Sequence, residues 1–144
     1  MTYEEYLQEN GKLIYRNVGT SMLPLLKQGR DLFIVESLNG KRPRKYDVIL
    51  YRRPPSEYVL HRVIKVRKED YVILGDNCLN REYGICDGDV LGIMTGYVRK
   101  GKQRSCESLT YKAYSHIWVW LYPVRALWMR MKAWMINRIR AKGI

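Results

Sequence analysis

The sequence predicts a mainly β protein with a short N-terminal helix and a longer, amphipathic C-terminal helix. Between residues 31 and 94, short apolar runs rich in Val, Ile, Leu and Tyr alternate with turn-forming and charged residues, a pattern typical of strands joined by turns. A chain of 144 residues is long enough to bury a core within one domain. The predicted strands lie within 32–35, 47–51, 58–66, 71–74 and 89–94.

Local signals mark the two helices. Thr2 and Glu5 have the spacing of a capping box, and Gly11 is suited to end a helix of about two turns. Near the C-terminus, Pro123 suits the first turn of a helix whose apolar periodicity continues to about Arg140.

Positive charge is concentrated in the last third of the chain. Of the net charge of +12, residues 1–98 contribute +2, from 15 Lys and Arg against 13 Asp and Glu. Residues 99–144 contribute +10, from 11 Lys and Arg against Glu107 alone. This division predicts a nearly neutral domain over 1–98, followed over 99–144 by a basic linker and a Trp-rich helical tail.

The cysteines argue against a metal site. Cys78, Cys86 and Cys106 have neither CxxC spacing nor neighbouring histidines, and their odd number indicates free thiols in a reducing compartment. No apolar run before Ser21 is long enough for a signal peptide or a membrane span. We therefore expect a cytoplasmic protein without a metal or other cofactor.

The turn Val18–Pro24 carries the best candidate nucleophile. In its sequence Val-Gly-Thr-Ser-Met-Leu-Pro, Gly19 supplies a permissive backbone and Pro24 restricts the exit of the chain. A serine nucleophile needs such a turn, because its hydroxyl must be exposed while its own N–H stays free for a developing oxyanion. Gly-Thr-Ser is also common in ordinary turns, so the role of Ser21 depends on motifs further along the chain.

Three further motifs follow Ser21-Met22-Leu23-Pro24 in a fixed order. They are Tyr46-Asp47-Val48, Leu60-His61-Arg62-Val63 and Gly75-Asp76-Asn77. This ordered set, over roughly residues 15 to 98, resembles the type I signal peptidase superfamily, which also contains the self-cleaving repressors of the DNA-damage response. The resemblance implies an architecture of coiled β-sheets and a serine peptidase that forms an acyl-enzyme.

The resemblance assigns the role of general base to His61, as in the histidine-type signal peptidases of the endoplasmic reticulum, archaea and some spore formers. A neutral imidazole is a competent base near pH 7, so activity is expected to rise through roughly pH 6–7. The alternative is that His61 is a half-buried strand residue satisfied by a neighbour. Lys65 lies on the same face of the predicted strand, about 7 Å further along, and is the one lysine that could replace it.

The acid that would orient His61 is open between several residues. Asp76, which the resemblance puts beside the active site, is the first choice. Glu82 and Asp87 are the alternatives, because the pair of aspartates found after this turn in histidine-type enzymes is missing here. A dyad without an acid is a further alternative.

The oxyanion hole also departs from the pattern of the resemblance. Many relatives have a serine two residues before the nucleophile, and here that position is Gly19. The Ser21 N–H would therefore act with a main-chain partner alone or with the Thr20 hydroxyl. Asn77 belongs to the turn that supports the site in the family.

The C-terminal periodicity predicts a helix with an apolar face and a mostly basic opposite face. A membrane span is excluded, because each Arg or Lys would cost about 2.5–3.5 kcal/mol at mid-bilayer. The helix is expected either to pack on the domain or to lie on an anionic membrane surface through residues 117–142, with the stretch from Met131 exposed in the intermediate case. A nucleic-acid arm is disfavoured, because the Trp residues belong to the apolar face. That face comprises Val124, Leu127, Trp128, Met131, Trp134, Met135 and Ile139.

These observations together predict a serine endopeptidase that cleaves a peptide or a precursor protein. Two alternatives stay open: a non-catalytic, peptide-binding relative, and a membrane-surface protein whose function is membrane binding by its tail. A self-cleaving transcriptional regulator would need a DNA-binding helix-turn-helix, for which the 20 residues before Ser21 leave no room.

Overall fold

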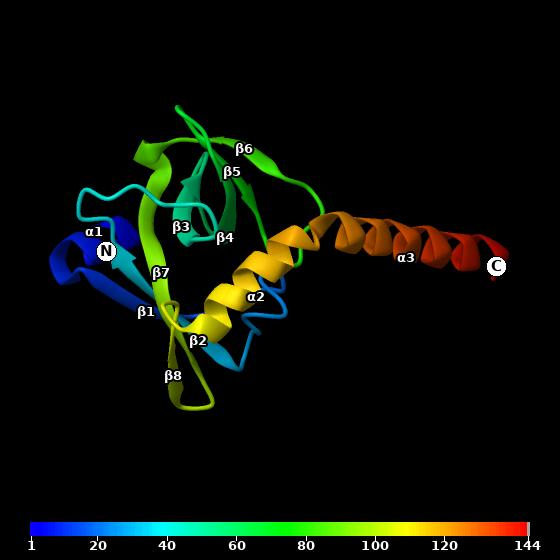
Figure 1. Cartoon of the computed structure of the whole chain (residues 1–144), viewed down its shortest axis with the longest axis horizontal. Coiled ribbons are helices and arrows are strands. Elements are labelled where there is room, and N and C mark those ends of the chain that lie inside the picture. The colour runs from blue at the N-terminus through cyan, green and yellow to red at the C-terminus, as the bar shows by residue number, and fades with distance from the viewer. Residues whose placement is uncertain (144) are drawn as a thin grey trace.

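The computed structural model describes residues 1–143, and its body is one antiparallel sheet of eight strands (Figure 1). The strands follow the order β1-β2-β7-β3-β4-β5-β6, and β8 pairs with β7 outside that path. This sheet confirms the predicted mainly β class. The strand bounds are β1 Lys12–Arg16, β2 Asp31–Ser37, β3 Val48–Arg53, β4 Glu57–Val66, β5 Tyr71–Leu74, β6 Glu82–Ile85, β7 Val90–Arg99 and β8 Lys102–Ser105.

Helices lie at both ends of the chain. The first, α1, spans Tyr3–Asn10 and has the predicted capping box: Glu5 N–H donates to Thr2 Oγ1 at 3.2 Å, and Thr2 N–H donates to Glu5 Oε2 at 2.8 Å. Gly11 ends this helix in the left-handed conformation, with φ at 73°. The remaining helical elements are the 3-10 turn η1 Asp87–Asp89, α2 Leu109–Trp120 and α3 Tyr122–Lys142.

Alternation along the central strands divides the core into two clusters. On β3, Val48 and Leu50 belong to one buried cluster, whereas Ile49 and Tyr51 belong to the other. In the register of β3 with β4, His61 lies opposite Ile49. Because residues two apart share a face of a sheet, His61 lies on the same face as Tyr51.

The segment 99–104 is part of the sheet, which corrects the expected basic linker. Strand β7 extends to Arg99, and β8 returns beside it with Arg99 opposite Lys102. Lys100 and Gly101 form the connecting turn in the left-handed region, with φ of 52° and 76°. All four residues of β8 are exposed, so basic side chains at this edge stay in solvent and their charge did not mark the end of the domain.

The body of the protein also includes α2, which the sequence did not predict as a separate helix. Ser108 caps it by accepting a hydrogen bond from Tyr111 N–H at 3.2 Å. Tyr111 and Ser115 are buried, and Tyr111 belongs to the first core cluster. The expected boundary after residue 98 is therefore corrected, because the packed structure continues through α2.

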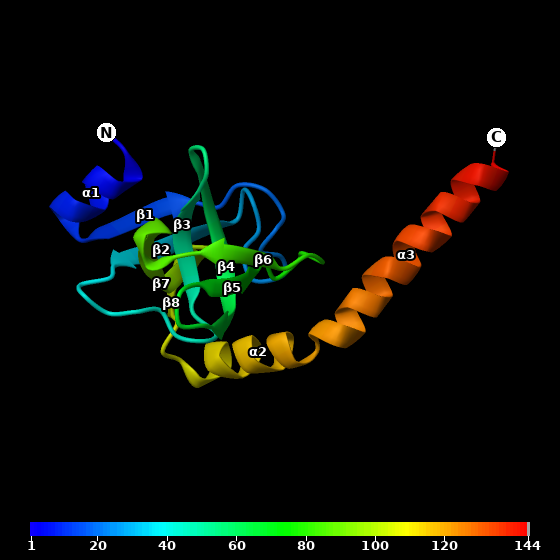
Figure 2. The ribbon, with the colours of Figure 1, turned by 90° about the horizontal axis from the view of Figure 1, so that it is seen from above.

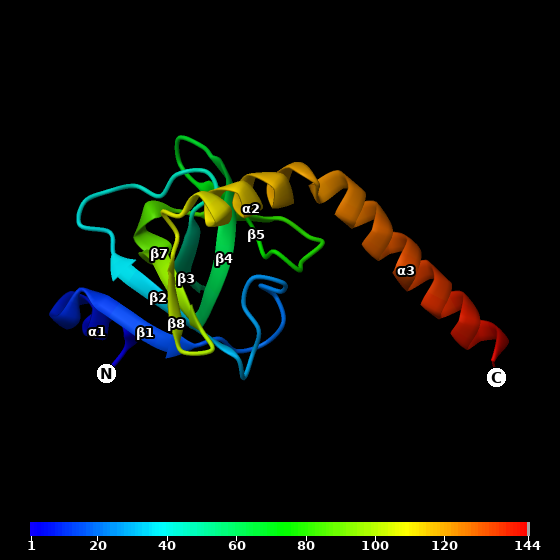
Figure 3. The same cartoon turned by 60° about the horizontal axis from the view of Figure 1, so that its bottom comes forward.

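The last helix, α3, projects away from the body (Figure 2 and Figure 3). Among its described residues Ala126 alone is buried, while Trp128, Met131 and Trp134 are 66%, 50% and 59% exposed. Exposure therefore begins before Met131, closer to the start of the helix than expected. Within residues 1–143, no helix is both long enough and apolar enough to span a bilayer.

Candidate active site

Ser21 is half-buried on the turn between β1 and β2. Gly19 has a φ of 84°, and its N–H donates to Gln28 Oε1 at 2.8 Å, which ties the two arms of the loop together. Met22 is 1% exposed and Leu26 is fully buried, so the residues after Ser21 anchor the turn in the core. Among the described residues no acceptor is bonded to the Ser21 N–H, which leaves this group available to an oxyanion.

The turn formed by Gly75, Asp76 and Asn77 is hydrogen-bonded to the turn Val18–Pro24, which carries the candidate nucleophile Ser21 and is called the nucleophile turn below. Asn77 N–H donates to the Ser21 carbonyl at 2.8 Å, and Asn77 Nδ2 donates to the Thr20 carbonyl at 3.1 Å. Two motifs that are far apart in the sequence are thus joined through their backbones. Asn77 therefore holds the two turns together through its backbone and its side chain.

Gly75 lies between the candidate nucleophile and the candidate base. A methyl group on its α-carbon would be 2.8 Å from the Ser21 carbonyl oxygen, 3.0 Å from His61 Cδ2 and 2.6 Å from Cys78 Sγ. The Ser21 backbone and the His61 ring therefore both pack against Gly75, and no side chain fits there. Within residues 1–143, Ser21 and His61 share no direct hydrogen bond, which is common in unliganded catalytic sites.

A tyrosine links His61 to a carboxylate. His61 Nδ1 lies 3.4 Å from Tyr51 Oη, and Tyr51 donates its own proton to Glu82 Oε2 at 2.7 Å. Arg53 donates two hydrogen bonds to the same carboxylate, at 2.9 and 2.7 Å. Because the Tyr51 proton is directed at Glu82, the Tyr51 oxygen can accept the Nδ1 proton of His61, which leaves Nε2 as the basic nitrogen.

His61 is neutral at pH 7. Burial, and after it the charge of Arg53, lowers the pKa of His61 to about 4. The hydrogen bonds from Arg53 lower the pKa of Glu82, so this carboxylate is ionised at pH 7. The ordinary imidazole pKa behind the expected rise of activity through pH 6–7 does not apply to this buried ring, so a rate that depended on neutral His61 would rise near pH 4.

The Asp76 carboxylate lies away from His61. It accepts hydrogen bonds from Arg62 Nε and Nη2 at 2.8 and 2.9 Å and from the Tyr114 hydroxyl at 2.7 Å. Arg62 is the neighbour of His61 on β4, so the two side chains point to opposite faces of the sheet. This corrects the first choice of Asp76 as the orienting acid, and Glu82 is the carboxylate that is joined to His61.

Two further candidates lie outside the site. The Asp87 carboxylate is 3.1 Å from Arg42 Nε and also accepts a hydrogen bond from the Tyr71 hydroxyl. Lys65 is exposed near the end of β4, opposite Val72 in register. Among the described residues, neither side chain has a hydrogen bond to Ser21 or His61.

Sequence reasoning missed Tyr51 and Arg53. Ile49 lies opposite His61, and Tyr51 lies two positions after Ile49 on the same face of the sheet. The pairing of the two strands, combined with the period of two residues, would therefore have identified Tyr51. Arg53 continues the same face by two more residues. The missing information was the pairing of β3 with β4 in this register, which no local pattern contains.

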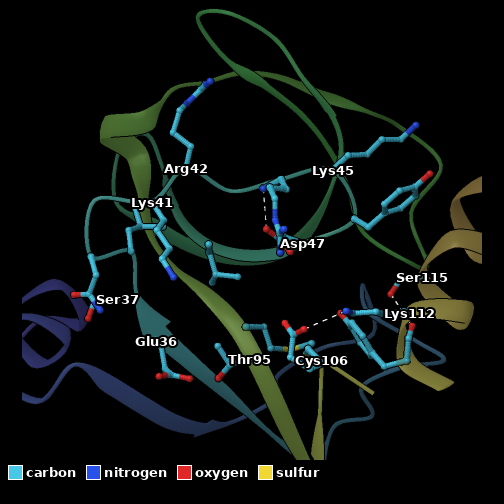
Figure 4. Close-up of a pocket in the computed structure, with 18 of the residues that line it drawn as sticks. Glu36, Ser37, Lys41, Arg42, Lys45, Asp47, Thr95, Cys106, Lys112 and Ser115 are labelled. Atoms are coloured by element: carbon cyan, nitrogen blue, oxygen red, sulfur yellow. Dashed lines mark hydrogen bonds and ion pairs between the residues drawn. The ribbon is translucent and has the colours of Figure 1, made fainter. Parts of the chain in front are cut away.

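One cavity of the molecule is separate from this site. It measures about 920 Å³ and lies between the 36–47 segment, β7 and α2 (Figure 4). Side chains of both charges line it, and Lys112 and Glu107 are paired there at 3.1 Å. Neither Ser21 nor His61 contributes to its lining.

A smaller cavity of about 560 Å³ adjoins the nucleophile turn. Residues 15–18 at the end of β1 and residues 28–32 at the start of β2 line it. Strand β1 is the terminal strand on its side of the sheet, so its outer edge carries peptide groups that can pair with another chain. An extended peptide can add to such an edge, and β1 leads directly towards Ser21.

Comparisons of the chain with protein-family models, with curated proteins and with solved structures found no match. In the part of the chain that the structure describes, no three His, Cys, Asp or Glu side chains are grouped so that they could hold a metal ion.

Proposed function

We propose that this chain is a serine peptidase of the signal-peptidase type, in which Ser21 is the nucleophile and His61 the general base. The observation that supports this best is the packing of the Ser21 backbone and the His61 ring against Gly75. Residues from three separate motifs meet at this point. The free Ser21 N–H and the neutral, buried imidazole are the further features that the reaction requires.

In the proposed reaction, Ser21 Oγ attacks the carbonyl carbon of a peptide bond while His61 Nε2 takes its proton, directly or through one water molecule. The Ser21 N–H stabilises the oxyanion, and the Thr20 hydroxyl is the candidate second donor. His61 then gives the proton to the leaving amine, and water hydrolyses the acyl-enzyme by the same route. Glu82, acting through Tyr51, stabilises the imidazolium that forms.

Labelling with a fluorophosphonate probe tests this function. We expect one modified residue, Ser21, in the full-length protein and no modification in the Ser21→Ala variant. Ser56→Ala removes an exposed loop serine and should label like the parent. Cleavage of a quenched-peptide library by the same proteins covers the case of a nucleophile that the probe does not reach. A protein that binds peptides but neither labels nor cleaves would contradict the proposal in favour of a peptide-binding module.

We also propose that α3 attaches the protein peripherally to an anionic membrane surface. Trp128, Trp134 and Ile139 are 66%, 59% and 66% exposed, so the apolar side chains of the helix have no cover in the body. The helix contains six Lys and Arg and no Asp or Glu. Apolar side chains can enter the acyl boundary while each basic residue gains about 1 kcal/mol near anionic headgroups.

The double variant Trp128→Ala/Trp134→Ala should lose binding to anionic vesicles and keep its stability. Both side chains are exposed, so the free energy of unfolding should change by about 0.5 kcal/mol or less per substitution. Cosedimentation with phosphatidylglycerol and phosphatidylcholine vesicles measures the binding, which should weaken as salt rises to about 0.5 M. Tyr83→Ala, an exposed aromatic outside α3, is the control. Equal binding of the parent protein to neutral and anionic vesicles, or no binding to either at any salt concentration, would contradict this proposal.

A further inference from the structure

Side chains at the junction between α2 and α3 bind the peptide group between Asp76 and Asn77. This peptide group belongs to the turn that is hydrogen-bonded to Ser21. The Asp76 carbonyl oxygen accepts a hydrogen bond from Trp118 Nε1 at 2.8 Å and another from Arg125 Nη1 at 2.9 Å. Trp118 lies near the end of α2, and Arg125 lies in the first turn of α3. Both donors therefore belong to the basic C-terminal part of the chain.

The same peptide group reaches the nucleophile turn. Its carbonyl belongs to Asp76 and its N–H to Asn77, and this N–H donates to the Ser21 carbonyl at 2.8 Å. A peptide unit is planar and stiff, so the hydrogen bonds to its oxygen also restrain the direction of its N–H. One rigid plane thus connects the tail to the backbone of Ser21.

The contacts of the junction are concentrated on this part of the domain. Arg125 Nε and Nη2 donate to the Trp118 carbonyl at 3.3 and 3.0 Å, and the guanidinium carbon lies 4.4 Å from the centre of the Trp118 ring. The Tyr122 hydroxyl donates to the Leu79 carbonyl at 2.6 Å. The two donors to Asp76 therefore have few alternative positions.

We propose that Trp118 and Arg125 are positioning residues for Ser21. By holding the peptide plane between Asp76 and Asn77, they keep the nucleophile turn against His61. The peptidase then reaches its full rate only when the α2–α3 junction is seated on this turn. The inference rests on the proposed function, but its structural half, the ordering of the turn by the tail, is measurable without any substrate.

Hydrogen exchange and fluorophosphonate labelling of full-length variants test this role. In Trp118→Phe, which keeps a ring but lacks the N–H donor, and in Arg125→Gln, the amides of Asn77 and Cys78 should exchange about tenfold faster. The labelling rate of Ser21 at saturating probe should fall about 10- to 100-fold. The probe concentration for half-maximal rate should not change. Arg125→Lys should recover part of the rate, because an ammonium group can donate to the same carbonyl.

Arg104→Gln is the matched control for a lost charge, because Arg104 is exposed on β8, and it should behave like the parent. Unchanged amide exchange in both variants overturns the proposal, and so does faster exchange with an unchanged labelling rate. If Arg125→Gln loosens the whole sheet, Trp118→Phe decides the question. A parent protein that neither labels nor cleaves peptides, with faster exchange in the variants, overturns the proposed peptidase and the catalytic half of this proposal with it.

Discussion

Replacing His61 with alanine should lower the rates of labelling and peptide cleavage by about 10³-fold or more. The reason is that the His61 ring packs against Gly75 beside the nucleophile turn, whereas Lys65 is exposed further along β4. In peptide cleavage, the double variant Ser21→Ala/His61→Ala should be about as inactive as Ser21→Ala alone, because the members of a catalytic pair are not additive. Rates measured over a range of substrate concentrations give this comparison.

The pH profile identifies the base. Since the pKa of His61 is about 4, the rate should rise with pH through that region and be level at pH 7, wherever melting curves show the parent folded. Lys65→Ala is the control and should follow the parent at every pH. A rate that increases only above about pH 8.5 would transfer the role of base to a lysine.

Replacing Asp76 with alanine should destabilise the fold by about 3–5 kcal/mol. The Arg62 and Asp76 side chains are 1% and 2% exposed and are joined by hydrogen bonds of 2.8 and 2.9 Å. Loss of the carboxylate leaves a buried guanidinium without its charge partner and the Tyr114 hydroxyl without its acceptor. Urea unfolding measures the change.

The exposed pair of Arg42 and Asp87 provides the matched control. Their side chains are 46% and 60% exposed, so Asp87→Ala should cost about 1 kcal/mol or less. Asp76→Asn, which keeps an acceptor but removes the charge, should fall between the two alanine variants. Equal losses for Asp76→Ala and Asp87→Ala would show that the buried pair has no special weight in the fold.

The features predicted correctly from the sequence depend on residues close together in the chain. The capping box of Thr2 and Glu5 and the stop at Gly11 involve neighbours within one or two helical turns. The mainly β class follows from apolar alternation within single strands. The Ser21 turn and the His61 strand were identified as candidates in the same way, from local motifs and their order.

The choice of acid could not be predicted in this way, because it depends on which face each carboxylate occupies. Asp76 lies close to the Ser21 turn, yet its side chain turns to Arg62 on the opposite face from His61. Glu82 reaches His61 because β3, β4, β5 and β6 lie side by side in the sheet and Tyr51 spans the distance between them. Strand order and register are long-range properties.

The same distinction between local and long-range information applies to residues 99–144. The sequence alone determined that residues 99–144 are strongly basic, that they contain a helix and that this helix is not apolar enough to span a bilayer. The tertiary structure decided where the domain ends, since β8 pairs with β7 and α2 is buried through Tyr111 and Ser115. The hydroxyl oxygens of Tyr111 and Ser115 accept hydrogen bonds from Arg62 Nη1 at 3.2 and 2.9 Å, and the buried charge of Arg62 needs such partners in the core. Composition reports the residues of a segment, whereas its place in the fold depends on partners elsewhere in the chain.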